Sequence, residues 1–187
     1  MITSRPVRLL SLAILALVVV VGVRGVVGGN GFSADLLERT GGTEPSAAGK
    51  RTPGVVAHVL DGDTVEFTTH DGRHVRVRFL AISAPEIPHP GEAGECYGGR
   101  SARHLKKLLP VGTRVTLVSD PTQDDVDTYG RWLRYVDATE RDIGRAQIGS
   151  GAATARDSSD PISRHAAYVR DEDQARERGA GLWTACR

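Results

Sequence analysis

Apolar residues recur at every second position in three successive segments, 54–60, 64–68 and 74–82. This is the period of a half-buried β-strand. The pair Asp61-Gly62 separates the first two segments, and the run 70–73, His-Asp-Gly-Arg, separates the next two. Asp-Gly accommodates the positive φ that tight hairpin turns need. The pattern therefore predicts an antiparallel meander of three strands.

A helix and two further strands follow. Pro85, Pro88 and Pro90 exclude a helix from 84 to 91, because proline lacks an amide hydrogen and restricts the residue before it. Helical spacing resumes near Tyr97, and alternation returns in two later segments. The remaining predicted elements are a helix ending at Pro110, strands at 113–118 and 133–138, and helices at 142–150 and 163–178.

The last segments are predicted to contain a helix cap and a docking site. Ser163 is predicted to cap the final long helix, and Leu182 and Trp183 are predicted to dock on the body of the domain. Five short strands with a helix between the third and fourth are typical of an OB-type barrel. The predicted fold class is therefore α+β, a five-stranded OB-type barrel with about three helices.

The first 28 residues are not predicted to belong to this domain. Arg5 and Arg8 precede an apolar run from Leu9 to Val23, which is typical of a secretory signal peptide or a membrane anchor. A full span needs about 20 apolar residues, so both interpretations stay open. The basic flank predicts that the amino end stays in the cytoplasm and the rest is exported.

The predicted organisation is an export or anchor helix at 1–28, a flexible linker at 29–53 and one domain at 54–187. The linker is rich in glycine, serine, threonine and alanine. In an exported protein, Cys96 and Cys186 are expected to form a disulfide. Two unrelated thiols are the alternative, and two cysteines are too few for a metal site.

The net charge of +1 provides no general basic field that would attract nucleic acid. Any phosphate binding must come from individual arginines. Candidates for such chemistry cluster near predicted strand ends, where Asp61, Asp63 and Glu86 accompany Arg78, and Arg131 follows on a later loop. Carboxylates suit a hard cation, and guanidinium groups bind phosphate oxygens in pairs. Each residue alone is commonly a turn or surface residue.

Six short motifs together resemble the staphylococcal nuclease (thermonuclease) family. They occur in the family's order between residues 55 and 183, over nearly the whole predicted domain. The motifs are Leu60-Asp-Gly-Asp-Thr-Val65, Arg76-Val-Arg-Phe-Leu80, Ala84-Pro-Glu86, Tyr97-Gly98, Tyr129-Gly-Arg131 and Gly181-Leu-Trp183.

The resemblance implies a monomeric, Ca²⁺-dependent endonuclease that cleaves DNA and RNA to leave 3′-phosphates. It also implies roles for individual residues. In these roles Asp63 is the main metal ligand, Asp61 an outer-sphere acid, the Ala84 carbonyl a backbone ligand, Glu86 the general base, Arg78 and Arg131 the phosphate-binding arginines, and Tyr129 a ring packed beside the phosphate.

Ser83 departs from the family pattern, which usually has aspartate at this position. A hydroxyl binds Ca²⁺ more weakly than a carboxylate. Three outcomes follow: a weaker but sufficient metal site with Ser83 as a weak ligand, replacement by another acid such as Asp61 or Glu92, or loss of catalysis with nucleic-acid binding retained. The stretch 152–161 also lacks the tyrosines that shape the family's nucleotide pocket, which predicts reduced base stacking.

The sequence therefore predicts an exported, membrane-tethered or secreted phosphodiesterase that acts on nucleic acid. The main alternative is a non-catalytic nucleic-acid-binding module at the cell surface. A structural barrel that binds another protein of the cell envelope is a third possibility.

Overall fold

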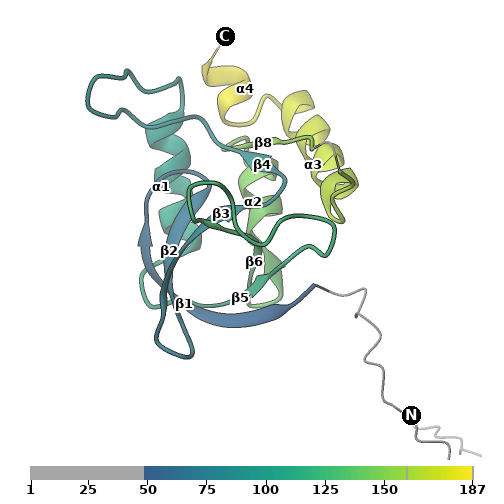
Figure 1. The fold of residues 1–187 in the computed structure, drawn as a ribbon. Helices are drawn as coiled ribbons and strands as arrows, with labels where there is room; N and C mark the ends of the chain where they lie inside the picture. The colour runs from purple at the N-terminus through teal and green to yellow at the C-terminus, as the bar shows by residue number, and fades with distance from the viewer. Residues whose placement is uncertain (1–48, 159, 187) are drawn as a thin grey trace, which may run out of the picture. The chain divides into compact units, whose positions relative to one another are not determined.

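A computed structural model describes residues 49–158 and 160–186, and within them five strands close into a barrel (Figure 1). The strand order is β3-β2-β1-β5-β6, and β3 pairs in parallel with β6 to complete the circle. The strands are β1 (Arg51–Val59), β2 (Thr64–Thr69), β3 (His74–Phe79), β5 (Arg114–Val118) and β6 (Trp132–Ala138). The predicted α+β class and the five-stranded OB-type barrel are confirmed for this part of the chain.

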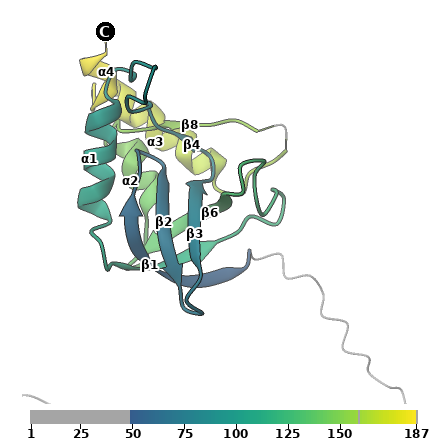
Figure 2. The same ribbon diagram turned by 60° about the vertical axis from the view of Figure 1, so that its left-hand side comes forward.

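Helices flank the barrel, and short strand pairs join them to it (Figure 2). Helix α2 lies between α1 and α3 and contacts both. The helices are α1 (Gly98–Leu108), α2 (Ile143–Gly149), α3 (His165–Glu177) and α4 (Leu182–Ala185), and the short strands are β4 (Ile82–Ser83), β7 (Arg141–Asp142) and β8 (Thr154–Ala155). As predicted, α1 separates the third and fourth long strands.

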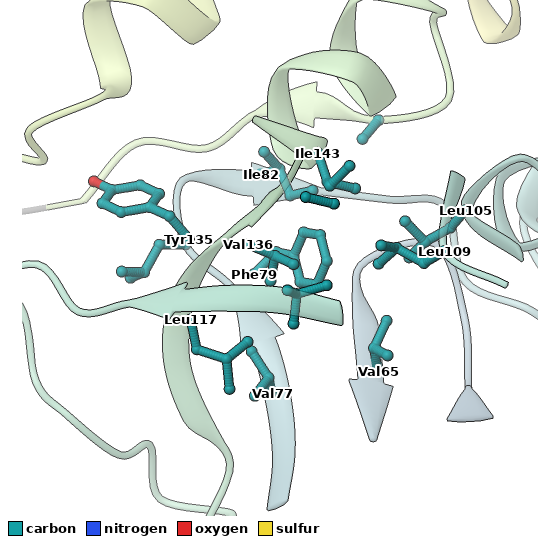
Figure 3. Packing of buried hydrophobic residues seen from close by; sticks show 14 of the residues in the cluster. Val65, Val77, Phe79, Ile82, Leu105, Leu109, Leu117, Tyr135, Val136 and Ile143 are labelled. Atoms are coloured by element: carbon teal, nitrogen blue, oxygen red, sulfur yellow. The ribbon is translucent and has the colours of Figure 1, made fainter. Parts of the chain in front are cut away.

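The alternating positions of the strands fill the barrel interior (Figure 3). Val65 and Val77 are fully buried on neighbouring strands, and Leu105 on α1 packs against the same cluster. Burying side chains of this size contributes about 1.5–3 kcal/mol each before the entropy cost. The period-two pattern in the sequence is thus the inward face of a closed sheet.

The predicted third strand extends too far. It was expected to run to Ile82, but β3 ends at Phe79 and Ala81 has a φ of 61°. The Leu80 amide donates to the Arg134 carbonyl at 3.0 Å. This left-handed turn breaks the strand, and residues 82–83 then pair with β8 in a separate small sheet.

The first strand begins earlier than predicted. Residues 51–53, which were assigned to the linker, lie in β1 and pair with 116–118 of β5. Cross-strand pairing compensates for the proline at position 53, a residue that local preference disfavours in strands. The polar composition of the segment hid this pairing.

Ser163 does not cap α3. The helix begins at His165, and Arg164 at its N-cap makes no side-chain capping hydrogen bond. The Ser163 hydroxyl instead donates to Asp120 Oδ1 at 3.1 Å. The buried carboxylate of Asp120 takes this donor because an unsatisfied buried charge costs more than an uncapped helix end.

Asp120 joins the loop after β5 to the start of α3. Tyr135 donates its hydroxyl to Asp120 Oδ2 at 2.5 Å, and the Ser163 amide donates to the same oxygen at 2.8 Å. Thr122 donates its hydroxyl to Oδ1 at 2.7 Å. Burial alone would raise the pKa of Asp120, but these hydrogen bonds, that of Tyr135 foremost, outweigh it and lower the pKa to about 2.

Protonation of Asp120 in acid should therefore lower the free energy of unfolding by a defined amount. Because the folded-state pKa lies near 2 and the ordinary value is 3.8, the contribution of about 2 kcal/mol is complete above about pH 4 and is lost as the pH falls through about 2. The D120N variant should be less stable by a similar amount and should lack this component. Urea unfolding of both proteins between about pH 2 and 5 measures it, and parallel pH profiles would contradict the prediction.

Cys96 and Cys186 form a disulfide, as predicted, with their Cα atoms 5.8 Å apart. The bond ties the segment after α4 to the residues just before α1. In the same region the Arg176 guanidinium lies 4.4 Å from the centre of the Trp183 ring. Leu182 and Trp183 are half-buried, which agrees with the predicted docking.

The predicted export or anchor segment at 1–28 and most of the predicted linker lie outside the described residues. Among the residues that are described, no helix has both the length and the apolar character needed to cross a membrane.

Candidate active site

The turn Asp61-Gly62-Asp63 joins β1 to β2. Asp61 Oδ1 accepts the amides of Asp63 at 2.9 Å and of Thr64 at 2.7 Å. A Cβ on Gly62 would lie 2.0 Å from Ser101 Oγ, so only glycine fits. The aspartates are therefore held by a tight turn packed against α1.

Gln147 supports this turn from α2. It is completely buried, and its Nε2 donates to the Gly62 carbonyl at 2.7 Å. Its Oε1 contacts His104 Nδ1 on α1. Sequence reasoning missed this residue, although a polar side chain next to Ile148 on the apolar face of a predicted helix was a usable signal.

Asp63 is the buried acid of the site, with 2% of its surface exposed. Its Oδ2 accepts the Ala84 amide at 2.7 Å and lies 2.9 Å from Arg78 Nη1, and its Oδ1 accepts the Thr64 hydroxyl at 3.1 Å. Burial raises the pKa of Asp63 to about 6, with Arg78 acting against the rise and Asp61 adding to it. Burial thus affects the pKa of this carboxyl group more than its ion pair with Arg78 does.

Arg78 is buried on β3, and its Nη1 also donates to the carbonyls of Phe79 at 3.2 Å and Ile82 at 3.0 Å. Burial lowers the pKa of Arg78, while Asp63 opposes that shift. The guanidinium group is thus fixed between the acid and the main chain of the β3–β4 turn.

Arg78 and Arg131 line one cleft of about 500 Å³, which we call the arginine cleft. Its walls come from the β3–β4 turn, the loop 127–131 and the segment 156–158. The structure therefore brings together the two arginines that were singled out in the sequence.

The loop 127–131 is a hydrogen-bonded turn before β6. Asp127 Oδ1 accepts the amides of Tyr129 and Arg131 at 2.9 Å each, and Arg131 Nε donates to Asp127 Oδ2 at 2.7 Å. Partial burial acts to raise the pKa of Asp127, but the hydrogen bonds from Arg131 outweigh it, so the pKa is lowered. The Tyr129 ring is 83% exposed, and the Arg131 guanidinium lies 5.2 Å from its centre. Both side chains are available to a ligand.

Glu86 is an exposed residue of the loop before α1. It is not among the residues that line the arginine cleft. Its amide donates to Glu95 Oε2 at 2.9 Å, and its carbonyl accepts the Glu95 amide at 2.9 Å. It follows Ala84 by two residues, so it stands close along the chain to the contact between Ala84 and Asp63.

Ser83 is half-buried on β4, and its carbonyl accepts the Thr154 hydroxyl at 3.3 Å. Among residues 49–158 and 160–186, no three His, Cys, Asp or Glu side chains gather as a metal-binding group. The site nevertheless offers oxygen donors of the kind a hard divalent cation prefers, a desolvated carboxylate at Asp63 beside a second one at Asp61. The residues fit such an ion with two acids rather than three.

Arg156 was also missed by sequence reasoning. It lines the arginine cleft with Arg78 and Arg131. It stands in a polar stretch without periodicity, and it follows a two-residue strand that no sequence pattern marks. No local signal identified it.

The family model described as Staphylococcal nuclease homologue matches residues 76–185 of this chain. The chain is 28% identical over 126 residues to the SPbeta prophage-derived endonuclease YokF of Bacillus subtilis (strain 168), a match covering 67% of this chain and 42% of that protein. It is 27% identical over 149 residues to endonuclease YncB of the same organism, covering 79% of this chain and 69% of YncB. It is 37% identical over 82 residues to the thermonuclease of Staphylococcus intermedius, covering 44% and 46%. The chain thus spans less than half the length of some curated relatives.

Proposed function

The chain belongs to the staphylococcal nuclease family, and from this premise we propose that it is an endonuclease that hydrolyses phosphodiester bonds in DNA and RNA with Ca²⁺. The observation that carries the proposal is the shared cleft of Arg78 and Arg131 together with the direct ion pair between Arg78 and Asp63. Relatives named as endonucleases support the same activity.

Arg78 and Arg131 bind the phosphate that is cleaved. Each guanidinium is planar and offers paired donors, which match two phosphate oxygens better than an ammonium group does. Arg78 is held by two main-chain carbonyls and Asp63, so its position does not change when charge develops on the phosphate. Fixed donors of this kind contribute most in the transition state.

Asp63, the Ala84 carbonyl and the Ser83 hydroxyl hold the metal ion in this proposal, and Asp61 acts on it through water. When bound, Ca²⁺ would neutralise phosphate charge and orient the attacking water. Asp63 is suited to the role because its carboxylate is held in a fixed position by the Ala84 amide, the Thr64 hydroxyl and Arg78. Ser83 adds a neutral donor, so fewer negative ligands surround the ion.

Glu86 accepts the proton of the attacking water as its oxygen adds to phosphorus. As the bond from phosphorus to the 5′-oxygen breaks, Arg131 stabilises the negative charge on that oxygen, which takes a proton from solvent water, and the phosphate stays on the 3′ side. Tyr129 packs its exposed ring beside the nucleotide. The proposed setting is outside the cytoplasm, with the chain secreted or tethered by residues 1–28. The disulfide supports it, because such bonds persist in oxidising compartments.

The E86Q variant tests this function. The purified chain should cut DNA with Ca²⁺ and should stop cutting when a chelator removes the ion. E86Q should lower kcat by about 100-fold or more, while DNA affinity stays within about twofold. E177Q is a matched control, because Glu177 is an exposed acid on α3 outside the arginine cleft. Equal turnover of E86Q and the unmodified chain would remove Glu86 from the mechanism.

A non-catalytic nucleic-acid-binding module is the second candidate. The observation that favours it is the absence of a third acid beside Asp61 and Asp63 among the described residues. Binding of DNA with no hydrolysis at any Ca²⁺ concentration would select this candidate over the nuclease.

A further inference from the structure

Arg156 is the third arginine of the cleft. Arg78 is paired with Asp63, and Arg131 is paired with Asp127. Within the part of the chain that the structure describes, the exposed Arg156 guanidinium makes no hydrogen bond and no ion pair. Its donors are available to a ligand in the cleft.

The main chain holds Arg156 in place. Its amide donates to the Ala81 carbonyl at 2.9 Å, directly after the pairing of β8 with β4. The amide of the preceding Ala155 donates to Glu172 Oε2 at 2.7 Å. Two residues later, the Ser158 hydroxyl donates to Gln123 Oε1 at 3.2 Å. An anchored backbone with a free side chain is the arrangement of a binding residue, since its position is set before the ligand arrives.

Three arginines and two aspartates line the cleft, so its charged side chains favour an anion. Arg156 and Arg131 both act to lower the pKa of Arg78, Arg156 more strongly. Of the two carboxylates that line the cleft, Asp127 binds Arg131, and the exposed Asp157 has its Oδ1 2.9 Å from His165 Nε2. Three guanidinium groups therefore repel one another, and anionic ligands relieve that repulsion.

Depth separates Arg156 from the phosphate site proposed above. Arg78 is only 8% exposed at the β3–β4 turn, whereas Arg156 is an exposed residue on another wall. A single phosphate that contacts both Arg78 and Arg131 leaves the exposed guanidinium free for a neighbouring group. In a polynucleotide, that group is the next phosphate along the strand.

We propose that Arg156 forms a second phosphate subsite, which binds a phosphate adjacent to the scissile one on a single nucleic-acid strand. The inference rests on the proposed nuclease function and deepens it. Only a substrate with at least two successive phosphates fills both subsites. We therefore expect the site to bind a longer strand more tightly than a dinucleotide with a single phosphate.

The salt dependence of binding tests the proposal. A fluorescent thymidine oligonucleotide is titrated with the E86Q chain in Ca²⁺ over a range of salt concentrations, and gels confirm that it stays intact. Losing one phosphate contact on single-stranded DNA reduces the slope of log K against log salt by about 0.7. Adding R156Q should cause this reduction. R170Q, which removes an exposed arginine of α3 outside the cleft, should not.

A modified oligonucleotide locates the subsite, and a second variant tests the proposed function. Replacing one linkage next to the scissile phosphate with a neutral methylphosphonate should weaken binding about tenfold in the E86Q chain, and should have little additional effect once Arg156 is removed. R131Q reports on the proposed function itself. If R131Q lowers the slope and R156Q does not, the second subsite is wrong and the nuclease proposal stands. If neither variant changes the slope, or no oligonucleotide binds, both are overturned.

Discussion

Replacing Arg78 with methionine should lower the free energy of unfolding by about 3–5 kcal/mol and abolish DNA hydrolysis. Asp63 is 2% exposed and has its ion pair with Arg78 at 2.9 Å. Removing the guanidinium leaves a buried carboxylate without a countercharge, which is among the most destabilising changes a core can undergo. The β3–β4 turn also loses the donor that binds the Phe79 and Ile82 carbonyls.

A double variant separates stability from catalysis. R78M/D63N removes both charges, so it should recover much of the stability that R78M loses, because replacing a whole buried ion pair is often close to neutral. It should remain inactive, since the groups proposed to bind the phosphate and the metal ion are both gone. Urea unfolding and a DNA cleavage assay measure the two properties. An R78M protein as stable as the unmodified chain would show that the ion pair does not hold the site together.

Removing the disulfide should destabilise the domain by about 4 kcal/mol with little effect on turnover at low temperature. Cys96 and Cys186 are 90 residues apart in sequence, and closing so long a loop restricts the unfolded chain strongly. Neither cysteine lines the arginine cleft. The C96A/C186A variant, compared with the oxidised chain by urea unfolding, should show the loss, and its kcat should stay within about twofold where it is folded.

The matched control for this experiment is the unmodified chain in a reducing agent. It should reproduce the stability of C96A/C186A, because both lack the same bond. A reduced chain that is markedly more stable than the double variant would show that the cysteine side chains contribute through packing, and that the bond contributes less than loop closure predicts.

The sequence pattern predicted the long strands and the helices well, because each has a full period of buried positions. Val65 and Val77, two of the alternating apolar positions, lie in the core. The two Asp-Gly pairs correctly predicted both tight turns, because the local backbone conformation of these residues decides where a turn forms. Of the candidate site residues, the structure joins Asp63, Arg78 and Ala84 directly and places Arg131 in the same cleft as Arg78.

The features that the sequence pattern missed depend on contacts between residues far apart in the chain. Strand β8 has two residues, too few to show any period, and its pairing with β4 is what brings Arg156 to the cleft. Ser163 had the local signature of a helix cap, but a carboxylate 43 positions earlier in the chain accepts its hydroxyl. Gln147 stands beside Ile148 on a predicted helix, which was a usable signal, but its partner, the Gly62 carbonyl, lies 85 positions earlier in the chain.

The parallel pairing of β3 with β6 has a consequence for when the chain can act. Its register sets Val77 against Trp132 and Arg78 against Leu133, so the contact that completes the circle of strands also brings Arg78 beside the strand that follows the loop of Arg131. Such distant segments meet late, because loop closure must precede their contacts. Until these segments meet, the proposed phosphate site is incomplete, so the cleavage proposed for this chain can begin only after the barrel has closed.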